Sequence, residues 1–204
     1  MSYIVGICGG SGSGKTTLSE LLLERLRAAG TTASLISFDN YYKHTPGMTP
    51  EQRAAYNFDE PAALDGHLLA RDLLLLKDGQ PAFVPEYDFS TQTRRPEPLR
   101  VDPADVILVE GILIYAVPEV RQALDLSLYV DAPADVRSLR RFVRDIEERG
   151  HTPQSAAALY LNTAREAHDR YVEPHKATSD LIIPNVFKEA TLNLLVTGII
   201  ANAR

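Results

Sequence analysis

The sequence lacks tryptophan and has a single cysteine, Cys8, so it cannot form an internal disulfide bond. Cys8 lies within an apolar stretch, and we interpret it as a buried side chain rather than a reactive thiol. No apolar run approaches the roughly 20 residues that span a bilayer, which argues against a membrane-spanning helix. A strand-like pattern begins already at Tyr3. We therefore expect no signal peptide and predict a cytoplasmic protein without membrane contact.

The sequence also lacks an excess of basic residues. It has 21 Lys and Arg against 27 Asp and Glu, a formal net charge of −6, which disfavours a nucleic-acid partner. The strings Asn-Lys-x-Asp and Asp-x-x-Gly of Ras-type GTPases are absent, and the five histidines show no metal-ligand spacing. These absences point to a small-molecule substrate.

A glycine-rich run follows an apolar stretch and precedes a helical pattern. It consists of Gly9, Gly10, Ser11, Gly12, Ser13, Gly14, Lys15 and Thr16, with Thr17 continuing into the helical pattern. Exposed backbone N–H groups, the helix N-terminus and a lysine together bind phosphates, and the threonine hydroxyl can ligate magnesium. The motif predicts a site for a nucleoside triphosphate with Mg²⁺.

Strand-like and helix-like patterns alternate along the 204 residues. Apolar runs that indicate strands cover residues 4–8, 34–37, 106–109, 126–130 and 181–183. Helical patterns cover residues 16–29, 64–77, 118–124, 134–149, 154–171 and 190–203. Several runs lack the alternation of a half-exposed sheet, which favours a parallel sheet covered on both faces. We predict an α/β fold of the P-loop NTPase type, a doubly wound parallel five-stranded sheet, in a single domain over residues 1–204.

Residues 81–103 interrupt this alternation. Five prolines surround an aromatic and polar stretch at residues 87–92. Because proline disfavours regular helix and central strand, we predict a hairpin-like insertion beside the active site.

Two acidic residues follow strand-like runs. Asp39 comes after residues 34–37 and Glu110 after residues 106–109. Carboxylates at this edge of a parallel sheet can hold magnesium and accept the proton of an attacking oxygen. The alternatives are a turn-forming Asp39 and a solvated Glu110 at a strand end.

The helical pattern at residues 134–149 is rich in arginine. Its arginines are Arg137, Arg140, Arg141, Arg144 and Arg149. Spacings of three and four place three of them on one face, which could close over phosphates as a helical lid formed by about residues 134–155. The alternative is a solvated face paired with Asp145, Glu147 and Glu148.

Several strings, in this order, resemble those of the uridine-cytidine kinases. They are residues 9–16, Ser37-Phe38-Asp39-Asn40-Tyr41-Tyr42, Asn57-Phe58-Asp59-Glu60-Pro61, Tyr87-Asp88-Phe89 and Glu110-Gly111-Ile112-Leu113. The match continues to about residue 185. The resemblance implies a P-loop kinase that uses ATP or GTP with Mg²⁺ to phosphorylate uridine or cytidine at the 5′-hydroxyl. It also implies a homo-oligomer, since members of that family are often tetramers.

The resemblance assigns roles to individual residues. Asp39 is expected to accept the hydroxyl proton and help place the metal, with Thr16 and Glu110 as further metal residues. Lys15 and the lid arginines Arg141, Arg144 and Arg149 are expected to balance phosphoryl charge, and Asp59 to bind a ribose hydroxyl, with Arg141 also at the substrate. The expected pocket residues are Tyr42, Phe58, Tyr87, Phe89 and Gln92. An amide can both donate and accept, so Gln92 is compatible with either pyrimidine edge.

Two positions depart from the family pattern. His151 stands where the kinases have an arginine, and Leu159 where they have a glutamine, and both family residues help hold the ribose. A related P-loop kinase for another small hydroxylated acceptor therefore remains an alternative. A nucleotide-binding regulator is a third hypothesis, although binding alone would not require Asp39 or the arginine-rich helix.

Overall fold

The computed structural model describes residues 1–43, 47–49, 52, 56–89, 91 and 93–203. Its centre is a five-stranded sheet in the order β2-β7-β1-β8-β9, with every pairing parallel. The strands are β1 (Tyr3–Cys8), β2 (Ala33–Ser37), β7 (Val106–Glu110), β8 (Leu126–Asp131) and β9 (Leu181–Pro184). The predicted doubly wound parallel sheet is confirmed, with every strand end within one residue of the expected bound.

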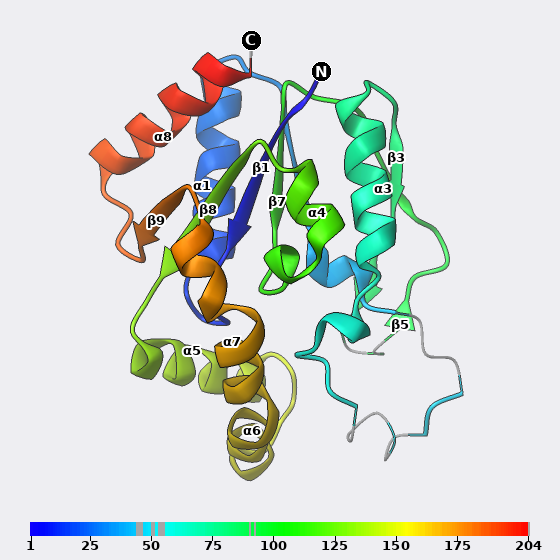
Figure 1. The fold of residues 1–204 in the computed structure, drawn as a ribbon. Helices are drawn as coiled ribbons and strands as arrows, with labels where there is room; N and C mark the ends of the chain where they lie inside the picture. The colour runs from blue at the N-terminus through cyan, green and yellow to red at the C-terminus, as the bar shows by residue number, and fades with distance from the viewer. Residues whose placement is uncertain (44–46, 50–51, 53–55, 90, 92, 204) are drawn as a thin grey trace.

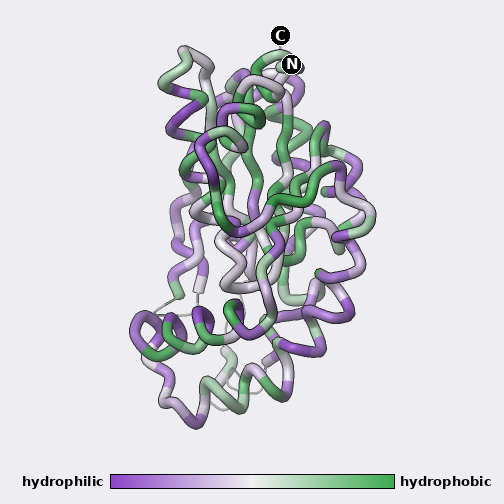
Figure 2. Tube along the Cα trace, turned by 90° about the vertical axis from the view of Figure 1, so that its left-hand side faces the viewer, coloured by the Kyte–Doolittle hydropathy of each residue, from purple (hydrophilic) through white to green (hydrophobic). Residues whose placement is uncertain are grey.

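Helices cover both faces of the sheet (Figure 1). They are α1 (Lys15–Ala28), α3 (Gly66–Lys77), α4 (Pro118–Ala123) and α8 (Glu189–Asn202). Successive residues of one strand enter two separate cores: Ile4 packs in the core that contains α3 and α4, whereas Val5 packs in the core that contains α1 and α8. This two-sided burial explains why central strands such as β1 and β7 are apolar at nearly every position, and Figure 2 shows hydrophobic segments in the interior of the molecule.

The insertion forms two short antiparallel ladders. The paired strands are β3 (Ala82–Val84) with β6 (Leu99–Val101) and β4 (Tyr87–Asp88) with β5 (Thr93–Arg94). Arg94 donates hydrogen bonds to the carbonyl oxygens of Tyr42 at 2.7 Å and Tyr41 at 2.8 Å. The insertion is thereby fastened to the 3₁₀ turn η1 (Phe38–Tyr41), which carries Asp39.

A helical region lies at the carboxyl ends of the strands, at the foot of Figure 1. It comprises α5 (Ala134–Glu147), α6 (Pro153–Leu159), the π-helical turn η4 (Tyr160–Ala164) and α7 (Arg165–Tyr171). The sequence predicted one regular helix over residues 154–171, so the π turn is a difference. Thr163 Oγ1 donates a hydrogen bond to the Leu159 carbonyl at 2.7 Å. In a regular α-helix this carbonyl accepts from the backbone N–H of Thr163, so the side chain competes for the same acceptor.

The remaining short elements are 3₁₀ turns that connect strands and helices. They are η2 (Pro61–Ala63), η3 (Ile114–Ala116) and η5 (Glu173–Thr178). Within the described residues, none of the helices combines the length and apolar character needed to cross a membrane.

Candidate functional site

The glycine-rich loop joins β1 to α1 and has left-handed backbone conformations at Gly12 (φ +77°) and Gly14 (φ +95°). A Cβ atom at Gly12 would lie 2.5 Å from the Arg137 carbonyl oxygen, so glycine is needed there both for its backbone and for space. Ser13 N–H donates to Gly10 O at 3.0 Å and tightens the loop. Thr16 and Thr17 are exposed in the first turn of α1.

Lys15 and Glu110 face each other at the base of this loop. Lys15 Nζ lies 4.0 Å from Glu110 Oε2, and both side chains are buried. Burial raises the pKa of Glu110, while the Lys15 charge and hydrogen bonds from Ser37 and Thr16 oppose that rise. A buried carboxylate with a raised pKa gains stabilisation from a nearby cation, which fits a divalent metal at this edge of the sheet.

Asp39 lies in η1, just beyond the carboxyl end of β2, and lines the same cavity as Lys15. Its carboxylate has no hydrogen bond or ion pair within the described part of the chain. The group is therefore available to accept a proton or contact a metal. Among the described residues, no three His, Cys, Asp or Glu side chains are placed to hold a metal ion together, so a metal here would take further ligands from phosphates and water.

Four aromatic side chains form one wall of this cavity. The ring centroid of Tyr42 lies 5.7 Å from that of Phe58, 5.3 Å from Tyr87 and 6.2 Å from Phe89. Burial, with the nearby charges of Asp39 and Asp59, raises the pKa of Tyr42, and its hydroxyl donates to Phe58 O at 3.1 Å. All four predicted aromatics thus come together, although they come from three separate segments of the sequence.

Tyr56 is a pocket residue that the sequence analysis missed. It lines the cavity and packs edge-on against Phe58 at 4.9 Å. Its position next to the motif that begins at Asn57 was the only available signal. Gln92, the predicted reader of the base edge, lies outside the described residues.

Arg141 enters the cavity from α5 and pairs with two carboxylates. Its Nη1 and Nη2 lie 2.9 and 3.0 Å from the two oxygens of Asp59, and its Nε lies 3.3 Å from Asp145 Oδ2. Burial alone would lower the pKa of Arg141, but the hydrogen bonds and charges of Asp59 and Asp145 outweigh it and raise the pKa. Arg141 is therefore a buried, fully charged group at the centre of the site.

Asp145 joins the three predicted lid arginines. Besides Arg141, it lies 3.3 Å from Arg144 Nη2 and 3.5 Å from Arg149 Nη1, and its side chain is only 2% exposed. The ion pairs of this helix face are thus partly buried, in contrast to the solvated face considered as an alternative.

The same arginines reach across to other parts of the site. Arg144 Nη2 donates to Ser11 Oγ in the phosphate loop at 3.1 Å. Burial, together with the charge of Arg149, lowers the pKa of Arg144. Arg149 lies over the ring of Phe89 at 5.2 Å, so the arginine-rich segment touches both the phosphate loop and the aromatic wall.

His151 and Leu159 also line this cavity. His151 Nδ1 lies 3.4 Å from Ser155 Oγ, whereas Leu159 offers only apolar surface. The two departures noted in the sequence therefore both face the space where an acceptor would lie.

Comparisons with known proteins find relatives that cover most of the chain. The model of the phosphoribulokinase / uridine kinase family matches residues 4–192. A protein named uridine kinase from Brevibacillus brevis is 43% identical over 197 residues, covering 96% of this chain and 91% of its own length. Another uridine kinase, from Staphylococcus epidermidis, is 44% identical over 181 residues, covering 89% of this chain and 86% of its own.

A solved structure agrees in fold. A structure described as a possible uridine kinase from Bacillus stearothermophilus has a TM-score of 0.64 and 22% identity, and the match covers 89% of this chain and 88% of that one. At this level of identity the likeness speaks for the fold alone.

Proposed function

This chain belongs to the phosphoribulokinase / uridine kinase family, and we propose that it transfers the γ-phosphoryl group of ATP or GTP to the 5′-hydroxyl of uridine or cytidine. The observation that carries this proposal is one cavity in which the phosphate-loop lysine, Asp39, Asp59 and the aromatic wall meet. A phosphate donor site and a pocket for a flat ring are thereby joined, as a nucleoside kinase requires.

The aromatic wall supports a nucleoside acceptor. Flat bases stack on aromatic rings, and each such contact is worth about 1–3 kcal/mol. Tyr42 stands at the centre of this wall and contacts Phe58, Tyr87 and Phe89. Gln92 follows Phe89 closely in the sequence, and we place it at the edge of the base, where its amide would donate or accept.

Asp39 is the group that would accept the proton of the 5′-hydroxyl. A carboxylate suffices because phosphoryl transfer demands alignment and charge balance more than strong basicity. Lys15, Arg144 and Arg149 would balance charge on the phosphoryl oxygens, and the left-handed turns of the phosphate loop expose backbone N–H groups to them.

Glu110, Thr16 and Asp39 would hold Mg²⁺ directly or through water. When bound, magnesium neutralises phosphate charge and orients the donor. Glu110 Oε1 accepts a hydrogen bond from Ser37 Oγ at 2.8 Å, and burial raises the pKa of Glu110. A cation bound on the side of the phosphate loop would stabilise the charged form of this carboxylate.

Asp59 and Arg141 would hold the ribose. A carboxylate oxygen of Asp59 can accept from a ribose hydroxyl while Arg141 keeps the carboxylate charged. The segment at about residues 134–155, which carries Arg141, would act as a lid that closes over the bound nucleoside.

The presence of His151 and Leu159 in the cavity favours a second candidate, a kinase of this family with another small hydroxylated acceptor. An acceptor panel separates the two: purified protein with Mg²⁺ and ATP is offered uridine, cytidine, purine nucleosides and non-nucleoside alcohols in turn, and ADP release is followed. We expect stimulation by uridine or cytidine. Turnover only with a different acceptor would replace the proposed substrate while keeping the phosphoryl-transfer site.

A further inference from the structure

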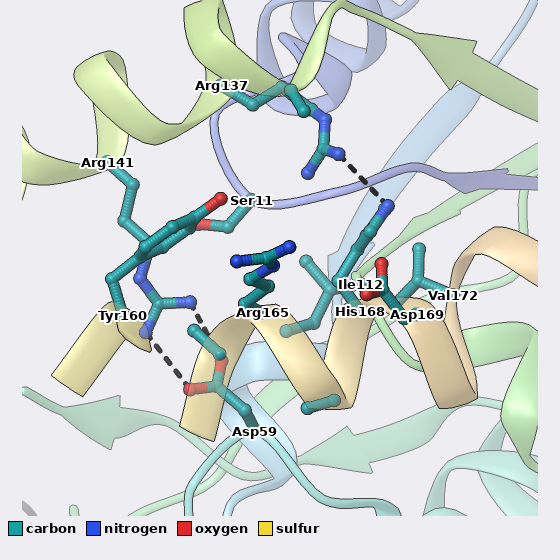
Figure 3. A pocket seen from close by; sticks show the side chains of 13 residues that line it. Ser11, Asp59, Ile112, Arg137, Arg141, Tyr160, Arg165, His168, Asp169 and Val172 are labelled. Carbon is teal, nitrogen blue, oxygen red and sulfur yellow. Dashed lines mark hydrogen bonds and ion pairs between the residues drawn. The ribbon is translucent and has the colours of Figure 1, made fainter. Parts of the chain in front are cut away.

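A second cavity, of about 210 Å³, lies between the phosphate loop, α5 and α7 (Figure 3). Its polar lining includes Ser11, Arg137, Tyr160, Arg165, His168 and Asp169. It adjoins the cavity lined by Lys15, Asp39 and the aromatic wall, which we call the acceptor cavity, across the Asp59–Arg141 ion pair that lines both spaces. The functions proposed for the acceptor cavity do not use Arg137, Arg165 or His168.

Two guanidinium groups in this second cavity lack a carboxylate partner. Arg165 makes no hydrogen bond or ion pair within the described residues, and in Figure 3 its guanidinium points into the cavity. Arg137 bonds the Ala132 carbonyl at 3.1 Å and His168 Nε2 at 3.0 Å. By contrast, Arg141 in the same wall is compensated by Asp59 and Asp145.

His168 supplies a buried ring nitrogen without a hydrogen-bond partner among the described residues. Arg137 Nη2 lies 3.0 Å from His168 Nε2, and the ring nitrogen that carries the hydrogen depends on the tautomer of His168. Glu173 Oε2 lies 3.2 Å from that same Nε2 and also accepts from the Tyr129 hydroxyl. Nδ1 is buried and has no partner in the described part of the chain. An unsatisfied buried polar atom of this kind calls for an explanation.

The π-helical turn separates the linings of the two cavities. Leu159, the last residue of α6, lines the acceptor cavity, whereas Tyr160, Ala164 and Arg165 line the second one. The backbone N–H of Arg165 bonds the Tyr160 carbonyl, five residues back, which widens the turn that presents Tyr160 and Arg165 to this space. Single π turns within helices are often found at functional sites.

We propose that the second cavity binds an oxyanion of phosphate size, as free phosphate or as the phosphate group of a small phosphorylated metabolite. Arg165 and Arg137, which have no ion-pair partner among the described residues, supply positive charge, and the hydroxyls of Ser11 and Tyr160 supply further donors. Apolar residues such as Ile112 and Val172 form a part of the wall that suits the organic portion of a phosphorylated metabolite. Because Arg137 is on α5 and Arg165 on α7, the bound anion ties these two helices together.

The test measures phosphate binding in a Lys15→Ala background, where the phosphate loop is disabled. Inorganic phosphate and ribose 5-phosphate are titrated separately at constant ionic strength, with calorimetry as the readout. Arg165→Gln should weaken binding about tenfold or more, because it removes a charge-assisted hydrogen bond. Arg170→Gln is the matched control: it removes the same charge from the same helix at a residue outside the cavity, and we expect a change within about twofold.

Asp169→Asn provides a test with the opposite sign. Asp169 is an exposed carboxylate in the cavity lining, so removing its charge should tighten phosphate binding severalfold. Tighter binding of ribose 5-phosphate than of inorganic phosphate identifies a phosphorylated metabolite as the ligand; equal binding identifies the free anion. Absence of binding, or equal affinity in the Arg165, Arg170 and Asp169 variants, overturns the proposal. The result is independent of the acceptor panel, since the Lys15→Ala background is not expected to turn over.

Discussion

Arg141 and Asp59 form a two-point ion pair that joins the arginine-rich helix to the acceptor cavity. Arg141 Nη1 lies 2.9 Å from Asp59 Oδ1, Nη2 lies 3.0 Å from Oδ2, and both side chains are 9% exposed. A ribose hydroxyl that reaches Asp59 must share this carboxylate with Arg141. On the proposed role of Asp59 in holding the ribose, substrate binding and the position of α5 would be linked through this one contact.

Asp59→Ala should lower both stability and uridine affinity. Loss of the carboxylate leaves Arg141 buried with Asp145 as its remaining counter-charge, which we expect to cost about 2 kcal/mol or more in the free energy of unfolding. Urea unfolding and the uridine KM measure the two effects. Asp102→Ala is the control, because its pair with Arg100 at 2.8 Å is exposed, and such pairs contribute about 0–1 kcal/mol. Equal losses in both variants would contradict a structural role of the buried pair.

Lys15→Ala should abolish turnover that depends on a nucleoside triphosphate. Lys15 is the buried cation at the phosphate loop, 4.0 Å from Glu110, and no other lysine lines the acceptor cavity within the described residues. Initial rates of ADP formation measure the effect. Lys43→Ala, at an exposed lysine, should retain the wild-type rate. Turnover of Lys15→Ala near that of Lys43→Ala would exclude the phosphate loop as the donor site.

The stability of the protein should fall at acidic pH in part through His168. Burial and the Arg137 charge lower the pKa of His168 in the folded protein. At pH values between this folded pKa and the unfolded pKa of about 6.5, the unfolded state therefore binds more protons than the folded state. Stability is therefore lost as the pH falls below about 6.5. His168→Gln removes this titration. His175, whose pKa is also lowered by burial and by the charge of Arg121, is present in both proteins.

Urea unfolding at about pH 7.5 and about pH 5.5 compares the two proteins. The wild type should lose more stability on acidification than His168→Gln does. An equal loss in both would show that His168 keeps an ordinary pKa in the folded state.

Gln92→Ala should change the preference between uridine and cytidine more than it changes ATP affinity. The physical reason is that an amide at the base edge would bond the cytosine amino group or the uracil carbonyl. The ratio of kcat/KM for the two nucleosides is the readout, with Gln80→Ala, at an exposed position, as the control. An unchanged ratio would remove Gln92 from base recognition.

The sheet could be predicted because its strands are buried on both faces. Residues such as Ile4 and Val5 enter opposite cores, so each strand is a short apolar run that stands out from the helices around it. The phosphate loop could also be predicted from the sequence, because the spacing of its glycines reflects the left-handed backbone required at Gly12 and Gly14.

Features set by tertiary contacts were not predictable in the same way. The π turn depends on the bond from Thr163 to the Leu159 carbonyl, and a threonine in a helical pattern gives no indication of it. Tyr56 lines the cavity beside Phe58, and the ion pairs of Asp145 with three arginines near it in the sequence are buried, which their spacing alone does not show. Arg94, which fastens the insertion to η1, was likewise not singled out.

The central claim is that Asp39 serves phosphoryl transfer to a nucleoside hydroxyl, and Asp39→Asn tests it most directly. Single-turnover formation of the nucleoside monophosphate is measured with uridine, alongside equilibrium binding of ATP with Mg²⁺. We expect ATP affinity to be retained while the rate falls by about 10²–10⁴-fold, the usual contribution of general base catalysis. A rate near that of the wild type, with ATP bound normally, would contradict the assignment of Asp39 as the base.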